Sequence, residues 1–192
     1  MNTEMLNALK EKAHPWAVEH SFYEEVKPDA FYLGLVMSEA GEAINADRKG
    51  MHADTKGFEE IEAAEKDFPF AENFKAHIKD TVEDEIADIV IRLLDFAGLK
   101  GYGLRYERNY ELTNPVFWVL EHEGLSSALF QLNYALGNSY DRGRLEEGIS
   151  RFIMIYSECF GKMTGSDKDL WWFVEQKMRY NDLRPRLNGK KY

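Results

Sequence analysis

Two pairs of acidic residues, each pair three positions apart, stand on stretches with helical patterning. The segment "SEAGEA" (38–43) carries Glu39 and Glu42, and "DEIADI" (84–89) carries Glu85 and Asp88. Residues three apart project from the same face of a helix, one turn apart, so the acids of each pair can converge. If the two helices pack antiparallel, the four carboxylates face one another. An all-oxygen site of this kind suits Mg²⁺, or Mn²⁺, with water and phosphate oxygens as the remaining ligands.

Either pair alone could instead be a solvated helix face, because glutamate is a good helix former and the chain has 34 acidic residues. The neighbouring residues favour a partly buried position. Glu39 lies beside Val36 and Ala40, and Glu85 and Asp88 stand among apolar residues. Like charges on such a face repel each other and lose hydration unless a cation compensates. We therefore expect a divalent cation between the pairs.

The C-terminal segment 177–192 has the opposite charge. It contains a single acid, Asp182, in a chain whose net charge is −10, and its basic residues are Lys177, Arg179, Arg184, Arg186, Lys190 and Lys191. An acidic body with a basic end could hold a metal ion and an anion side by side. The overall negative charge argues against a nucleic-acid polymer as the partner.

The elements that must position these residues are predicted to be helices throughout. Apolar residues recur at helical spacing over about 28–50, 72–99, 113–137, 141–160 and 166–178, and more weakly near 3–12. Thr113 or Asn114 is the expected start of the third of these helices, and a short acidic helix broken at Pro69 should lie between the first two. No β-alternation is long enough for a sheet. The fold class is therefore all-α, a bundle of two helical hairpins.

A faint internal echo leaves open whether the two hairpins arose by duplication. Residues 84–98 align with 147–161, and "SEAGEA" lies roughly over "GLSSAL" (124–129), but Gly148 and Arg151 replace Glu85 and Asp88. Any two buried helices can share such an apolar pattern. We expect one domain over 1–192, with a metal-binding hairpin at 28–100, an insert at about 51–70, a second helical half at 113–180 and a basic tail at 181–192.

The composition limits the setting of the chain. With 192 residues, 44% of them apolar, it can form a compact core, and no apolar run is long enough for a membrane span. The first residues lack the apolar core of a secretion signal, and the one cysteine, Cys159, excludes an intrachain disulfide. A cytoplasmic location without membrane contact is expected. Cys159 itself stands in an apolar run typical of a buried structural thiol.

Glu39-x-x-Glu42 followed by Glu85-x-x-Asp88 resembles the metal motif of the MazG-like, all-α nucleoside triphosphate pyrophosphatases, a superfamily that includes the dimeric dUTPases. The tail "EQKMRYNDLRPRLNGKKY" is similar to the family's closing segment, in which a lysine and an asparagine four apart contact the nucleotide; here these are Lys177 and Asn181. The resemblance covers about 28–50, 72–100 and 166–191. It departs from the family at Ser38, where a further glutamate is usual, and in the long gap of 42 residues (43–84) between the acid pairs.

The resemblance implies that a nucleoside or deoxynucleoside triphosphate is hydrolysed to the monophosphate and pyrophosphate, as in the clearance of unwanted nucleotides. The four acids would hold Mg²⁺ as two ions, with Glu39 as the general base. The implied substrate contacts are phosphate for Lys177, Arg184 and Lys190, and sugar or base for Asn181. Trp16, Phe22, Trp171 and Trp172 could stack on a base or simply pack in the core. The family also suggests a homodimer. The alternative is a non-catalytic helical protein that binds nucleotide or serves as a scaffold.

Overall fold

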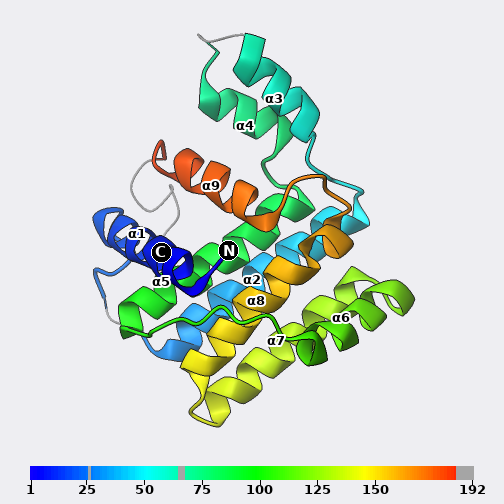
Figure 1. Cartoon of the computed structure of the whole chain (residues 1–192). Helices are drawn as coiled ribbons and strands as arrows, with labels where there is room; N and C mark the ends of the chain where they lie inside the picture. Colours follow the sequence, from blue (N-terminus) through cyan, green and yellow to red (C-terminus); the bar gives the residue numbers. More distant parts are fainter. Residues whose placement is uncertain (26, 65–67, 185–192) are drawn as a thin grey trace.

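The protein is described by a computed structural model over residues 1–25, 27–64 and 68–184. Within these ranges it forms nine α-helices and no strand, which confirms the all-α class (Figure 1). None of these helices is long and apolar enough to cross a bilayer. The helices are α1 (Thr3–Glu19), α2 (Asp29–Arg48), α3 (Thr55–Ala64), α4 (Phe70–His77), α5 (Val82–Lys100), α6 (Tyr110–His122), α7 (Leu125–Asp141), α8 (Leu145–Thr164) and α9 (Leu170–Asn181).

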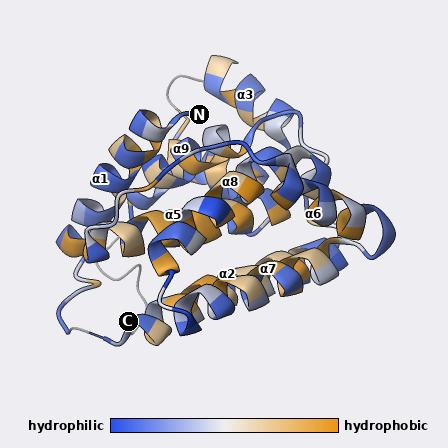
Figure 2. Ribbon diagram, turned by 60° about the horizontal axis from the view of Figure 1, so that its bottom comes forward, coloured by the Kyte–Doolittle hydropathy of each residue, from blue (hydrophilic) through white to orange (hydrophobic). Residues whose placement is uncertain are grey.

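Helix α5 is the centre of the bundle and packs against α1, α2, α8 and α9. Ile86, Ile89, Val90, Leu93 and Leu94 have no solvent exposure, and they point to different sides of the helix. A helix that is apolar nearly all round is buried by its neighbours. Figure 2 shows the same pattern as hydrophobic stretches on α2, α5, α7 and α8. The polar residues of α5 are consequently carried into the interior of the bundle.

Helices α2 and α5 pack antiparallel, as the convergence of the two acid pairs requires. The Lys100 ammonium at the end of α5 lies 3.1 Å from Oδ1 of Asp29 at the start of α2. At the other end of the pair, the Val82 amide donates to the carbonyl of Met51, just after α2, at 3.0 Å. The acid pairs therefore face each other across the two helices.

The long helix predicted over 72–99 is divided. It consists of α4 and α5, separated at residues 78–81. Asp80 adopts φ +62°, a conformation that aspartate tolerates better than most residues. Thr81 then begins the new helix, because its hydroxyl accepts a hydrogen bond from the Asp84 amide. The threonine followed by three acids in the first turn was the sequence signal for this break.

The helix predicted over 113–137 is also two helices, α6 and α7. Asn109 caps α6 by accepting from the Glu111 amide, so Pro115 lies inside the helix rather than in its first turn. Gly124, at φ +85°, separates the two helices in a conformation that glycine reaches without steric strain. The remaining predicted helices are present with shifted ends. The first extends to Glu19, and α8 ends before Gly165 instead of Gly161.

The insert between the acid pairs forms α3 and α4, which pack on each other and stand at the top of Figure 1. They attach to α9: Phe58 makes an edge contact with Trp172, and Arg179 pairs with Glu62 at 3.1 Å. Among the acids of the insert, Glu59 and Glu60 are exposed and Glu62 is half-buried, whereas Glu65 lies outside the described residues.

The second hairpin does not repeat the geometry of the first at the echoed positions. Helices α7 and α8 approach so closely at Gly148 that a Cβ there would lie 2.6 Å from Cβ of Ser139, near the end of α7. In the aligned segments, Leu125 and Ala128 take the positions of Glu39 and Glu42, so a repeated site would need Gly148 to face these two residues at the start of α7. Ala128 precedes Ser139 by 11 residues (139 − 128), about 16 Å along a helix. The echoed positions therefore do not form a second, degenerate site.

Cys159 is fully buried in α8. Burial raises the pKa of its thiol to about 12, so the thiolate is not populated at neutral pH. This environment agrees with the structural role expected from the sequence.

Candidate functional site

Three of the four predicted acids meet in a cavity of about 260 Å³ that α1, α2, α5 and α9 line. Glu39, Glu85 and Asp88 each offer a carboxylate oxygen within 4.8 Å of the others. Glu42 lines the same cavity but is exposed and is not one of these three. The structure thus brings the two helices' acids together, with Glu42 at the solvent side.

Two of these carboxylates, Glu39 and Glu85, are buried, and Asp88 is half-buried. Glu39 and Glu85 are each only 4% exposed. Glu85 lies in the first turn of α5, where the helix dipole favours negative charge. The preceding acid, Glu83, has a structural task, since its carboxylate accepts from the Ala53 amide at 2.9 Å and holds the chain that follows α2.

Two basic side chains are built into the acidic cluster. The first is Arg92 on α5, whose Nε donates to Oε1 of Glu39 at 2.5 Å. Burial raises the pKa of the Glu39 carboxyl, and the nearby Asp88 adds to this, whereas Arg92 opposes it. The sequence reasoning missed Arg92, although it follows Asp88 by one helical turn and so must share its face.

The second basic group is Lys177 of α9, only 4% exposed. Its ammonium lies 2.8 Å from both carboxylate oxygens of Asp84 and 2.8 Å from Oδ2 of Asp88. Burial disfavours its charge, but the two aspartates outweigh burial and raise the pKa of Lys177. Asp84 was also missed from the sequence. The neighbouring Glu85, and not Asp84, belongs to the Glu85-x-x-Asp88 motif. Asp84 acquires its partner, Lys177, only through the packing of α9 on α5.

Glu85 differs from the other acids of the cluster. Among the described residues, no group donates a hydrogen bond or forms an ion pair to its carboxylate. Burial and the adjacent charges of Asp84 and Asp88 raise the pKa of Glu85 to about 9. A buried carboxyl without a partner is costly, and a bound cation is one way to compensate it.

No family model, curated protein or solved structure matches this chain.

The cluster fits a small divalent cation that prefers oxygen ligands. Adjacent oxygens around an octahedral Mg²⁺ lie about 3.0 Å apart and opposite ones about 4.2 Å, so carboxylates within 4.8 Å of one another could bind one ion after they move closer. A second group of acids, Asp80, Asp84 and Glu85, is less suited. Asp84 already accepts from Lys177 with both oxygens and from the Asp80 amide.

The residues expected to bind substrate are divided between the cavity and other places. Asn181 and Arg184 line the cavity with Lys177, and an Arg184 guanidinium N–H donates to Oδ1 of Asn181 at 3.4 Å. Lys190 lies outside the described residues. Trp16 and Phe22 also line the cavity, whereas Trp171 donates its indole N–H to Ser157 and Trp172 packs on Phe173.

A second hollow of about 530 Å³ adjoins the acidic cavity. Phe22, Arg92 and Asp95 line both, so the two lie next to each other. The residues that line the second hollow include Tyr23 and Tyr32. An acidic, cation-compatible cavity thus lies beside an aromatic hollow.

Proposed function

We propose that the protein is a Mg²⁺-dependent nucleoside triphosphate pyrophosphohydrolase. The observation that carries the proposal is the convergence of Glu39, Glu85 and Asp88 in one cavity that Lys177 and Asn181 also line. The sequence resemblance to the MazG-like pyrophosphatases supports the same reaction. Clearance of unwanted nucleotides would be the corresponding role.

In the proposed reaction, a water oxygen bonds to the α-phosphorus while the bond from that phosphorus to the α,β-bridging oxygen breaks. Pyrophosphate leaves with the electron pair, and the nucleoside monophosphate remains. Glu39 would take the water's proton, since burial and the nearby Asp88 raise the pKa of its carboxyl and so make it a better proton acceptor. Mg²⁺ held by Glu39, Glu85 and Asp88, with Glu42 available for a second ion, would neutralise charge on the phosphates and orient the water.

The other cavity residues would bind the rest of the substrate. Lys177 and Arg184 would contact phosphate oxygens, and Asn181 the sugar or base. Trp16 and Phe22 would stack on the base, with the adjoining aromatic hollow giving it room. Lys190 is also a proposed phosphate contact, from the tail.

We further propose that the active form is a homodimer. Helix α7 has no charged residue from Leu125 to Tyr140, although 30% of the chain is charged. Its solvent face carries Phe130 and Tyr134, which are 70% and 66% exposed. Because each copy has a net charge of −10, two copies can approach most easily over an uncharged face.

The proposed activity is tested by pyrophosphate release from a panel of canonical and modified nucleoside triphosphates with Mg²⁺. We expect at least one substrate to be turned over, and Asp88→Asn to reduce kcat/KM about 100-fold or more, as loss of a metal ligand should. Glu121→Gln, which removes an exposed acid on α6, should have no effect. Full activity in Asp88→Asn would exclude this site.

The second candidate function is nucleotide binding without catalysis. It is favoured by Arg92 and Lys177, which already compensate two of the carboxylates and could keep the fold intact without turnover. Absence of pyrophosphate release from every triphosphate, together with saturable nucleotide binding, would support this alternative over the hydrolase.

A further inference from the structure

Each of the three clustered carboxylates has a different charge environment. Arg92 pairs with Glu39, Lys177 pairs with Asp88, and Glu85 has no hydrogen-bonded partner among the described residues. Two of the three cation ligands are thus held by basic side chains of the protein. A divalent cation that enters this cluster comes close to an ammonium and a guanidinium, and both repel it.

Neither basic side chain can easily turn away into water. The Lys177 side chain is 5% exposed, and the Asp84 carboxylate that also holds it has no exposure. The Arg92 side chain is 27% exposed and lies at the junction of the acidic cavity and the aromatic hollow. Arg92 and Lys177 therefore remain in the site when a cation arrives. Because the cation then shares the negative charge of Glu39 and Asp88 with them, the two basic side chains need a further anion.

Phosphate oxygens are the natural replacement, because both side chains line the cavity in which the phosphates of a triphosphate would lie. Lys177 has three N–H donors, and the three short contacts to Asp84 and Asp88 use them all. Transfer of one donor from Asp88 to a phosphate would free Asp88 for the cation while Asp84 keeps Lys177 in place. Arg92 has donors beyond the Nε that Glu39 engages, so it can bind a phosphate in the same way.

We propose that Arg92 and Lys177 couple cation binding to polyphosphate binding. Each is a counter-ion of one metal-binding carboxylate in the free protein and a phosphate ligand in the complex, so cation and polyphosphate bind strongly only together. Asp84 is the positioning residue that retains Lys177. This inference rests on the proposed function, and it assigns the substrate class as a divalent cation complex of a polyphosphate rather than a free anion.

The test is calorimetric titration of Mg²⁺ into the intact protein, without and with saturating methylenediphosphonate, a pyrophosphate analogue that is not hydrolysed. We expect the wild-type protein to bind Mg²⁺ about tenfold or more tightly with the analogue than without it. Arg92→Gln should bind Mg²⁺ more tightly than wild type without the analogue, and the gain from the analogue should shrink. Lys100→Gln is the control, because Lys100 on α5 pairs with Asp29 on α2 outside the cavity. This variant should behave as wild type.

Lys177→Gln leaves Asp84 as a buried carboxylate without a partner, so the double variant Asp84→Asn/Lys177→Gln is the suitable second test. It should also bind Mg²⁺ more tightly than wild type without the analogue. If neither Arg92→Gln nor the double variant does so, and the analogue still strengthens Mg²⁺ binding in both, the coupling role is wrong. If the wild-type protein binds no Mg²⁺ under either condition, the proposed metal site and function fail as well.

Discussion

Glu85 is the residue on which the proposed cation site depends most directly, because it is buried and without a hydrogen-bonded partner among the described residues. Its pKa is raised by burial to about 9, against 4.5 in an exposed glutamate. The folded protein therefore holds a proton on Glu85 that the unfolded chain releases above about pH 4.5. The contribution of Glu85 to stability is greatest below that pH and is lost as pH rises toward 9.

The corresponding prediction concerns Glu85→Gln in buffer with EDTA. We expect this variant to unfold at a higher temperature than wild type, with a stability gain that grows between pH 5 and pH 9 and is on the order of 2 kcal/mol at pH 7. Thermal unfolding followed by circular dichroism measures the difference. Mg²⁺ should stabilise wild type but not the variant. A gain independent of pH would show that burial does not raise the pKa of Glu85.

At the level of helices, the site depends on where α5 begins. Thr81 accepts from the Asp84 amide and donates to the Ile78 carbonyl at 2.6 Å, which ends one helix and starts the next. That start decides which turn of α5 carries Glu85 and Asp88.

Removal of this cap should weaken both stability and metal binding. Thr81→Ala is expected to lower the free energy of unfolding by about 1 kcal/mol and to weaken Mg²⁺ binding in the presence of polyphosphate. Asn109→Ala removes the cap of α6, which carries no residue of the acidic cavity, and should cost similar stability without changing Mg²⁺ affinity. Denaturant unfolding and calorimetry measure the two effects. Equal Mg²⁺ affinity in both variants would show that the Thr81 cap does not support Mg²⁺ binding.

The contact of α9 with α5 is the other interaction between helices that forms the site. Lys177→Met should destabilise the protein by about 3 kcal/mol, because the buried carboxylate of Asp84 loses its partner. Asp84→Asn/Lys177→Met removes both charges and should recover more than half of that loss. Urea unfolding of the two variants provides the comparison. If the double variant is as unstable as the single one, the cost comes from packing and not from the unpaired charge.

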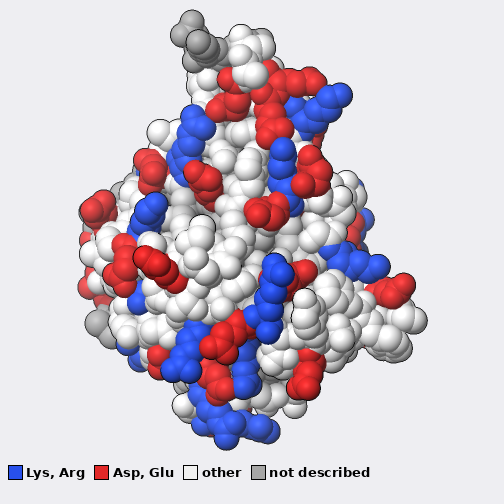
Figure 3. Space-filling model, viewed as in Figure 1, with Lys and Arg blue, Asp and Glu red and all other residues white. Residues whose placement is uncertain are grey.

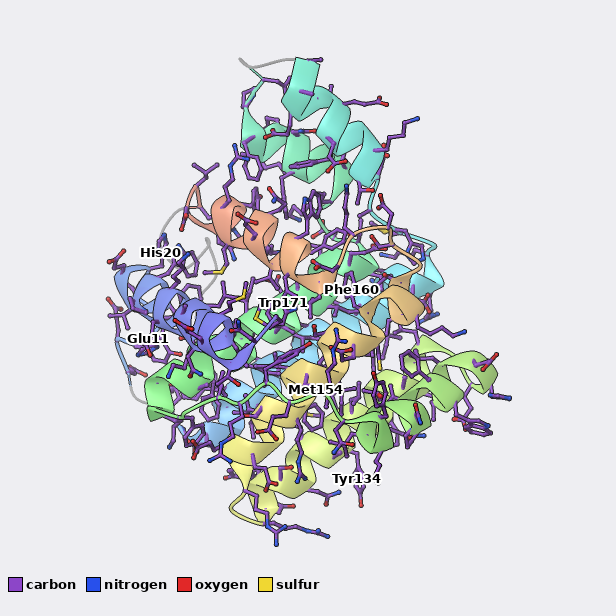
Figure 4. All side chains as sticks on the ribbon, viewed as in Figure 1. Glu11, His20, Tyr134, Met154, Phe160 and Trp171 are labelled. Atoms are coloured by element: carbon purple, nitrogen blue, oxygen red, sulfur yellow. The ribbon has the colours of Figure 1, made fainter. Side chains whose placement is uncertain are left out.

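At the scale of the whole molecule, the charged side chains are unevenly distributed. On the face shown in Figure 3, acidic side chains gather over the insert helices at the top, and basic and acidic side chains are mixed at the bottom. Helix α7, in contrast, presents aromatic side chains to solvent, and Figure 4 shows Tyr134 pointing away from the bundle. This distribution makes α7 the expected contact between two copies.

Tyr134→Glu should therefore convert a homodimer into monomers, because it introduces a charge at the centre of the uncharged face. The measurement is mass by light scattering after size exclusion, at several protein concentrations. Met5→Glu is the control, since Met5 is 53% exposed but belongs to α1. A wild-type protein that is monomeric at every concentration would contradict the dimer, and an unchanged dimer in Tyr134→Glu would contradict this interface.

The sequence was sufficient to predict the all-α class and three of the clustered acids, because helical periodicity and i,i+3 spacing are local properties of the chain. The resemblance of the tail to a known family, and not the spacing, suggested Lys177 and Asn181, which line the same cavity as those acids. The breaks at Asp80 and Gly124 were missed because the apolar pattern continues across them, and only the caps and backbone conformations mark the ends. Arg92 and Asp84 acquire their roles from α2 and α9, which lie far from them in the sequence. Only tertiary packing could decide which acid has a basic partner and which has none, because that depends on side chains that meet across helices.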